Sequence, residues 1–284
     1  MSSDIKDFGG GWSDKKLNVL AEYLQAYTTV LKNQPFELLC IDAFAGAGRA
    51  LVEEQREDSL FDNSEIESDA SYRHGSPLQA IQNEPPFQRF IFIDRNEESM
   101  ESLRDQCEAT DAGKAGRISY ITGDANAELL KIAQQDWRQR RGVAFLDPYA
   151  LHVTWDTIKA IADTKAIDMW LLFPAMAVNR MLPRSGTVPP VWADKLTETF
   201  GNDEWRRVFF KTETADLFGM ESTSKTPEPF QKLSEYVTSR LRSVFAGVVD
   251  APLFLLCFGS GHPTGAVIAK RIANHIIKKQ SHGK

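Results

Sequence analysis

The chain alternates short apolar runs with segments that have the spacing of amphipathic helices. Apolar runs of strand length, bounded by turn residues, are typical of strands buried on both faces. Strands that alternate with helices predict a parallel sheet, and right-handed crossovers make that sheet doubly wound. We therefore predict an α/β fold with a mostly parallel sheet. The five runs are "FELLCIDAFAGAG" (36–48), "RFIFID" (89–94), "ISYITGDA" (118–125), "GVAFLDPY" (142–149) and "AIDMWLLFP" (166–174).

Helical periodicity fills the segments around these runs. The first helix is expected at 13–33, with Ser13 or Asp14 as its cap. A second is expected in "GSPLQAIQ", where Ser76 is the predicted N-cap and Pro77 the first helical residue. Further helices are expected at 96–110, 126–139 and 154–164.

The pattern changes after residue 174 and suggests an elaboration of the domain. Residues 175–225 mix short helical stretches with a Gly/Pro-rich loop, so we expect an inserted helical cap. A long helix, a late strand at 252–260 and a final helix follow, and we expect this strand to return to the sheet. The predicted α/β domain therefore comprises 1–174 and 226–284.

Charge is concentrated in one segment. Residues 52–75 hold eight acidic residues and two arginines, so their formal charge equals the −6 of the whole chain. With few apolar residues, this segment is expected to be a flexible surface loop. The acidic balance argues against tight non-specific DNA binding, which is built from phosphate contacts.

Cysteine usage and hydropathy indicate the compartment. Cys40, Cys107 and Cys257 are scattered and form no Cys-x-x-Cys pair, so we expect reduced, buried thiols and no metal site. No apolar run is long enough to span a bilayer, and the first residues lack the apolar core of a signal peptide. These features predict a cytoplasmic protein without membrane association.

Four predicted strands deliver a carboxylate to one edge of the sheet. Asp42, Asp94, Asp124 and Asp147 lie at or near the carboxyl ends of successive strands. Ligands of open α/β sheets bind beyond these ends, near the point where the strand order reverses. The sequence therefore predicts a ligand site at this edge.

A glycine turn follows the first of these carboxylates. Gly46 and Gly48 allow a sharp turn and a close approach to a ligand, whereas the pyrophosphate patterns Gly-x-Gly-x-x-Gly and Gly-Lys-Ser/Thr are absent. An acid ahead of the glycines suits an amine-bearing ligand such as the amino-acid end of S-adenosylmethionine (SAM). Asp94 is placed to accept ribose hydroxyls, and Asp124 to reach an adenine amine. Tight packing of the turn and N-capping by each aspartate are the structural alternatives.

These motifs in this order resemble a class I SAM-dependent methyltransferase. More closely, "IDAFAGAG", "GSPLQAI", "FIFIDRN", "AFLDPYAL" and "LLCFGSGHPTG" resemble the three-Cys-motif partner protein (TcmP) family of bacteria. The resemblance implies a Rossmann-like methyltransferase fold working beside a three-Cys-motif partner of the metal-cluster or radical type. It also implies that SAM is the cofactor, held by Asp42, Phe44, Ala45, Gly46, Gly48, Asp94, Asp124 and Ala125.

Enzymes of this kind that methylate exocyclic base amines end a strand with Asp-Pro-Pro-aromatic. Here Asp147, Pro148 and Tyr149 match with one proline instead of two, so the aromatic residue lies one place nearer the acid. The resemblance implies that Asp147 and the Pro148 carbonyl accept hydrogen bonds from the target amine and that Tyr149 stacks on the base. Asp147 as a helix cap is the alternative.

Three functions are consistent with these residues. The leading one is SAM-dependent methylation of a nucleic-acid base amine. The second is a non-catalytic SAM- or nucleotide-binding partner subunit of a modification system. The third is a nicotinamide-dependent oxidoreductase, which shares the fold but needs the missing Gly-x-Gly-x-x-Gly pattern. His262, after the late strand, is expected either to cap its own helix or to approach the pocket.

Overall fold

A seven-stranded sheet organises the computed structural model, which describes residues 11–51, 72–214, 221–227, 229–249 and 255–282. The strand order is β10-β11-β7-β6-β1-β4-β5. The five strands from β7 to β5 are parallel, as predicted, while β11 runs antiparallel to both of its neighbours. The strands are β1 (Glu37–Asp42), β4 (Arg89–Asp94), β5 (Ile118–Thr122), β6 (Arg140–Leu146), β7 (Ile167–Leu172), β10 (Gly247–Val249) and β11 (Leu256–Ser260).

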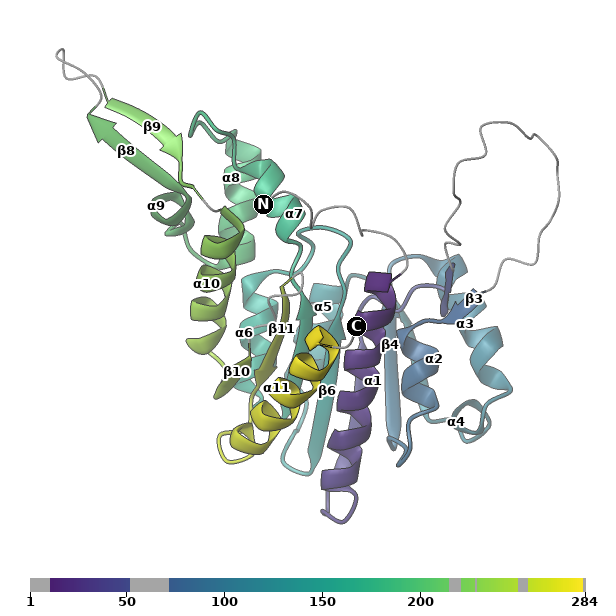
Figure 1. Ribbon diagram of the computed structural model, residues 1–284. Helices are drawn as coiled ribbons and strands as arrows, with labels where there is room; N and C mark the ends of the chain where they lie inside the picture. Colours follow the sequence, from purple (N-terminus) through teal and green to yellow (C-terminus); the bar gives the residue numbers. More distant parts are fainter. Residues whose placement is uncertain (1–10, 52–71, 215–220, 228, 250–254, 283–284) are drawn as a thin grey trace.

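Helices cover both faces of this sheet, which confirms the doubly wound arrangement (Figure 1). Alternate residues of β1 serve the two faces: Leu38 and Cys40 pack into one apolar cluster, and Leu39 and Ile41 into the other. The first cluster lies under α1 (Gly11–Leu31), α2 (Ser76–Ile81), α3 (Glu97–Glu108) and α11 (Ala266–His282). The second lies under α5 (Ala125–Ala133), α6 (Trp155–Asp163), α7 (Ala175–Met181) and α10 (Pro229–Arg242).

The order of the strands reverses beside β1. The chain proceeds from β1 to β4 and β5 on one side and then returns to β6 and β7 on the other. The switch point therefore lies between β1 and β6, and it brings the carboxyl ends of these strands together.

The region predicted as a helical cap also contains a β-hairpin. It holds α7, α8 (Pro190–Phe200) and α9 (Trp205–Phe209), followed by β8 (Phe210–Thr214) paired with β9 (Glu221–Lys225). The hairpin extends beyond the helices in Figure 1. The residues of both strands are mostly polar. They therefore lack the alternation of apolar and polar residues from which a strand is predicted in a sequence. Phe200 and Phe209 join the same apolar cluster as the main sheet.

Several predicted boundaries need correction. Helix α1 begins at Gly11, ahead of the expected Ser13 or Asp14 cap, and Gly75 rather than Ser76 occupies the N-cap position of α2. At the ends of the acidic segment, β2 (Arg49–Leu51) pairs with β3 (Tyr72–His74), so residues 72–74 form a strand rather than a loop. Residues 52–71 lie outside the described residues.

The structure also shows where the cysteines lie and how long and how apolar the described helices are. Cys40, Cys107 and Cys257 are buried, as predicted, and they form no disulfide in the described structure. In the described ranges, every helix is too short or too polar to cross a membrane.

Candidate functional site

The carboxyl ends of β1, β4 and β6 form one edge of the sheet, from which the candidate site is built. The register places Asp42 opposite both Phe92 of β4 and Phe145 of β6. The chain leaving β1 stays attached to both neighbours, because the Ala43 amide donates to the Phe145 carbonyl (3.1 Å) and the Ala45 amide to the Ile93 carbonyl (3.0 Å). The glycine turn is thus fixed between the two strand ends.

Asp42 is a buried carboxylate with unused hydrogen-bonding capacity. Only 2% of the residue is exposed, and its Oδ1 accepts from the Phe44 amide at 3.2 Å. Its Oδ2 is buried and has no hydrogen-bond partner in the described part of the chain. Burial raises the pKa of Asp42 to about 7, against the lowering effects of the Ser76 hydroxyl, the Phe44 amide and Lys16. An unsatisfied buried polar atom is costly, and such atoms often mark a ligand site.

The two glycines of the turn are required for different reasons. Both have left-handed backbone conformations, with φ of +58° at Gly46 and +76° at Gly48. A Cβ at Gly48 would stand 2.7 Å from Leu103 Cδ1, so this glycine permits close packing of the turn on α3. A Cβ at Gly46 would meet no atom within 4 Å, so Gly46 leaves open space beside the strand ends. The packing alternative therefore explains Gly48 but not Gly46.

Asp94 ties the end of β4 to the glycine turn. One carboxylate oxygen accepts from the Gly46 amide at 2.9 Å, and the other from the Asn96 amide at 2.8 Å. A carboxylate has about four acceptor sites, so each oxygen keeps capacity for a further donor such as a hydroxyl. Asp94 thus orients the turn and remains able to accept from a ligand.

Asp124 is the N-cap of α5. Its side chain accepts from the Ala127 amide at 3.1 Å and lies 3.4 Å from Arg95 Nη2. The capping alternative is therefore confirmed for this residue, while contact with an adenine stays a prediction. Ala125, the first residue of α5, is buried.

Asp147 forms an ion pair that the sequence did not predict. Its Oδ2 lies 2.5 Å from Lys16 Nζ, and the two side chains are 27% and 14% exposed, respectively. The side chain that caps α6 belongs to Thr154, so the capping alternative for Asp147 is wrong. Lys16 also lowers the pKa of Asp42, so its ammonium acts on two of the edge carboxylates.

A signal for Lys16 was present in the sequence. Lys16 precedes Leu20 by four residues and Tyr23 by seven, so it continues the stripe that packs α1 on the sheet. A lysine in the apolar stripe of a helix needs a buried or half-buried anionic partner. Which carboxylate it meets is decided by the crossing of α1 over the sheet. Ser76, predicted as a cap, instead belongs to the surroundings of Asp42.

The other predicted residues differ in exposure. Pro148 and Ala45 are buried, and Phe44 packs half-buried against the core. Tyr149 is 96% exposed, so the structure does not bring its ring against Asp147. His262 caps its own helix as expected, because its Nδ1 accepts from the Gly265 amide at 3.0 Å. It lies at the opposite end of the sheet from Asp42, since it follows Ser260, which pairs with Asp168 at the start of β7.

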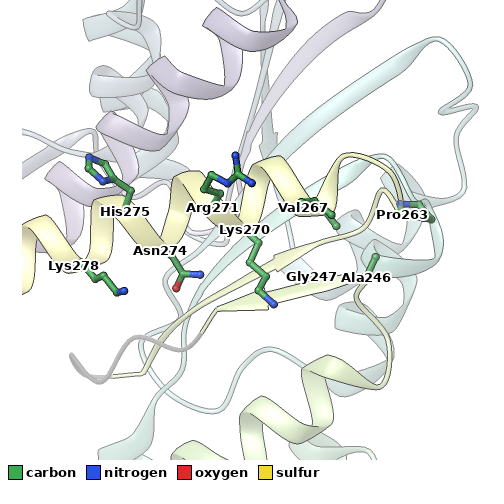
Figure 2. Close-up of a pocket in the computed structure, with 10 residues that line it drawn as sticks. Ala246, Gly247, Pro263, Val267, Lys270, Arg271, Asn274, His275 and Lys278 are labelled. Atoms are coloured by element: carbon green, nitrogen blue, oxygen red, sulfur yellow. The ribbon is translucent and has the colours of Figure 1, made fainter.

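A groove of about 530 Å³ lies away from this edge, between α11 and the outer strand β10. Figure 2 shows Lys270, Asn274 and Lys278 extending from α11 toward the side of β10. None of the residues predicted for the cofactor or acceptor lines this groove. Its size therefore does not identify it as the site of the predicted chemistry.

No model of a known protein family matches the chain, and no curated protein matches it. Among solved structures, protein LPL1258 from Legionella pneumophila is similar at 13% identity and a TM-score of 0.41, over 84% of this chain and 93% of that chain. Trm1 from Pyrococcus horikoshii, in complex with SAM, is similar at 9% identity and a TM-score of 0.36, over 96% and 82%. The plantazolicin methyltransferase BamL, in complex with SAH, is similar at 11% identity and a TM-score of 0.34, over 86% and 83%.

Similarities this low carry no argument about function. The fold is defined here by the strand order, and a function has to be argued from the residues of the site. The site offers a buried carboxylate with one oxygen that has no partner in the described structure, an open glycine turn and a second carboxylate that holds this turn. Such a set can accept an ammonium group and a pair of hydroxyls from one ligand. A third carboxylate, that of Asp147, is already paired with the ammonium group of Lys16.

Proposed function

We propose that this protein is a SAM-dependent methyltransferase that acts on an amine, with an exocyclic amine of a nucleic-acid base as its target. The observation that carries the proposal is the buried Oδ2 of Asp42, which has no hydrogen-bond partner in the described structure, at the strand end that leads into the Gly46–Gly48 turn. An oxygen in this position is stabilised by a ligand that donates to it, and the α-ammonium group of SAM is such a donor.

The residues present fit this cofactor. Asp42 and the Gly46–Gly48 turn would hold the amino-acid end, and the spare acceptor positions of Asp94 would take the ribose hydroxyls. Asp124 would face the adenine with the oxygen it shares with Arg95. When bound, SAM supplies an electrophilic methyl group on its sulfonium sulfur. The chain's own residues bind and orient the two reactants, which is a large part of the rate enhancement in such a transfer.

Asp147 and Pro148 are proposed to hold the acceptor. The Asp147 carboxylate and the Pro148 carbonyl would accept from the two N–H bonds of the target amine and direct its lone pair away from them. Tyr149 follows the acceptor residues in the chain, and its ring is 96% exposed, so it is free to stack on a flat target such as a base. After transfer the amine loses a proton to water, so no strong general base is required.

Lys16 occupies the hydrogen-bonding position that an acceptor amine needs. Its ammonium donates to the Asp147 carboxylate at 2.5 Å, which supports the proposal that this oxygen can accept from an N–H donor. A substrate amine must displace Lys16 from Asp147 before it can bind there.

The contact between Lys16 and Asp147 also favours a second candidate function, a non-catalytic SAM- or nucleotide-binding subunit in which Lys16 keeps the acceptor position closed. The three-Cys-motif partner remains a prediction from the sequence for either function.

Calorimetric titration of the full chain with SAM tests the cofactor site. We expect binding that is lost in Asp94→Ala and kept in the control Asp136→Ala, whose exposed carboxylate pairs with Arg138 away from the site. NAD serves as the control ligand for the oxidoreductase alternative. Absence of SAM binding in the wild-type chain would overturn the proposal.

Methyl transfer to single-stranded DNA and RNA oligonucleotides, measured with SAM carrying a labelled methyl group, tests the acceptor site. We expect Asp147→Ala to abolish transfer with little change in SAM affinity. SAM binding without transfer to either nucleic acid would favour the non-catalytic subunit.

A further inference from the structure

A second cavity lies at the opposite end of the sheet from the candidate site. It has a volume of about 370 Å³ and lies between α1 and α11, above the first residues of β7 and the last residue of β11. A cavity of this volume is in the range of small-molecule sites. Most of its wall is apolar, formed by Val30, Leu31, Phe36, Ile268, Ala269 and Ile272.

A carboxylate is fixed in the wall of this cavity. Asp168 is 7% exposed, and its Oδ2 accepts from the Tyr23 hydroxyl at 2.7 Å. Burial raises the pKa of Asp168 to about 6, against hydrogen bonds from Ser260, Tyr23 and the Gly261 amide. The carboxyl is therefore ionised at neutral pH, and with three donors it keeps capacity for about one more.

A guanidinium is fixed in the same wall. Arg141 Nη1 donates to the Arg140 carbonyl at 2.6 Å and to the Trp137 carbonyl at 3.3 Å. Its Cζ also lies 3.9 Å from the centre of the Phe36 ring. These contacts use only one of the guanidinium nitrogens, so the Nε and Nη2 donors remain for a ligand.

The two charges share the cavity without forming an ion pair with each other anywhere in the described structure. Arg141 is close enough to lower the pKa of Asp168, yet each group is held in place by other residues. Asp168 is buried and Arg141 is half-buried, so both charges have lost part of their hydration without forming an ion pair with each other. A ligand with one positive and one negative group would satisfy both at once.

We propose that this cavity binds a small zwitterion, namely a free α-amino acid with an apolar side chain. The ammonium group would face Asp168, the carboxylate would face Arg141, and the side chain would pack against the apolar wall. The ligand differs from the proposed methyl donor and acceptor, and the site shares no residue with the candidate methyltransferase edge.

Calorimetric titration of the full chain with L-phenylalanine and L-leucine, at about pH 8 so that Asp168 is ionised, tests this proposal. Two analogues of phenylalanine each remove one charge: 2-phenylethylamine lacks the carboxylate, and 3-phenylpropionate lacks the ammonium. We expect each analogue to bind at least about tenfold more weakly than phenylalanine. Equal binding of the analogues, or no binding of either amino acid, would overturn the proposal.

A matched pair of rim variants locates the binding event. Ile268 lines this cavity and is 52% exposed, whereas its neighbour Val267 is 64% exposed and lines the groove on the other side of α11. Ile268→Trp should block the cavity and abolish amino-acid binding, while Val267→Trp should leave it unchanged. Loss of binding in both variants, or in neither, would place the ligand elsewhere.

Asp168→Asn supplies a third variant and separates this site from the methyltransferase edge. It should weaken phenylalanine binding at least about tenfold and leave the titration with SAM unchanged. If this variant fails to fold, the comparison of ligand analogues on the wild-type chain still decides the question. If SAM does not bind but phenylalanine does, the proposed function fails and this inference stands.

Discussion

Asp42 shows how a single residue connects stability with binding. Its carboxylate is desolvated and only partly satisfied, and burial raises its pKa to about 7. Under the proposed function, bound SAM rather than the protein would provide the missing donor.

We predict that Asp42→Asn stabilises the free protein above neutral pH and weakens SAM binding. The unfolded chain releases the Asp42 proton near pH 4 and the folded protein releases it near pH 7, so the stability of the wild type falls as pH rises between these values. The asparagine has no such titration. Its advantage in free energy of unfolding should therefore grow from about pH 4 to about pH 7 and then stay constant.

Urea unfolding at several pH values measures this advantage, and calorimetry measures the loss of SAM affinity, expected at about tenfold or more for a charge-assisted hydrogen bond. An advantage that does not change with pH would contradict the pKa assigned to Asp42. Unchanged SAM affinity would exclude the carboxylate from the cofactor site.

The Lys16–Asp147 pair gives a second prediction at the residue scale. Because both side chains are largely buried, we expect a coupling energy of about 1–2 kcal/mol in a double-mutant cycle with Lys16→Met and Asp147→Asn. The exposed pair Lys159–Asp163 is the control, with an expected coupling of about 0.3–0.5 kcal/mol. Chemical denaturation of the four chains in each cycle supplies the values. Equal coupling in the two cycles would mean that Lys16 is not held at Asp147 in solution.

At the scale of elements, the turn after β1 combines two requirements. Its backbone must reverse direction within a few residues, and under the proposed function it must also leave space for SAM at the strand ends. Gly46 meets both, because it has a positive φ and no neighbour within 4 Å of the Cβ position.

We predict that Gly46→Ala costs about 1–2 kcal/mol of stability and also weakens SAM binding, because the methyl group enters the open space in the turn proposed to hold SAM. Gly116 offers a matched control, since it too has a positive φ (+63°) and an open Cβ position but lies in the loop before β5, away from the cofactor residues. Gly116→Ala should cost a similar amount of stability and leave SAM affinity unchanged. A parallel loss of affinity in both variants would indicate a global effect instead of a cofactor site at Gly46.

At the scale of the whole molecule, the two proposed sites lie at opposite ends of one sheet. Asp42 is the last residue of β1, at its carboxyl end, whereas Asp168 lies near the amino end of β7. The residues that form the two sites do not overlap, and a packed core separates them.

We therefore predict that SAM and phenylalanine stabilise the protein additively. A ligand at about 100 times its dissociation constant adds about 2.7 kcal/mol to the free energy of unfolding. The two ligands together should add the sum of their separate effects, measured by denaturant unfolding with each ligand and with both. A combined effect only slightly above the larger single effect, about 3.1 kcal/mol instead of about 5.4 kcal/mol, would mean that they compete for one site.

The sequence by itself determined the sheet and the edge at which the chemistry is expected. The apolar runs predicted the five parallel strands, because burial on both faces requires continuous apolar residues. The position of each carboxylate follows directly, since parallel strands place their carboxyl ends at one edge. The turn at Gly46 and Gly48 was likewise a local property, set by the backbone freedom of glycine.

The tertiary structure alone decided which groups meet across the molecule. Lys16 and Asp147 are 131 residues apart in the chain, and Tyr23 and Asp168 are 145 apart, so no periodicity relates them. Only the crossing of α1 over the sheet brings both pairs together. The same holds for the exposure of Tyr149 and for the apolar cavity between α1 and α11. Local patterns predict elements because backbone geometry repeats, whereas contacts between distant side chains depend on how those elements pack.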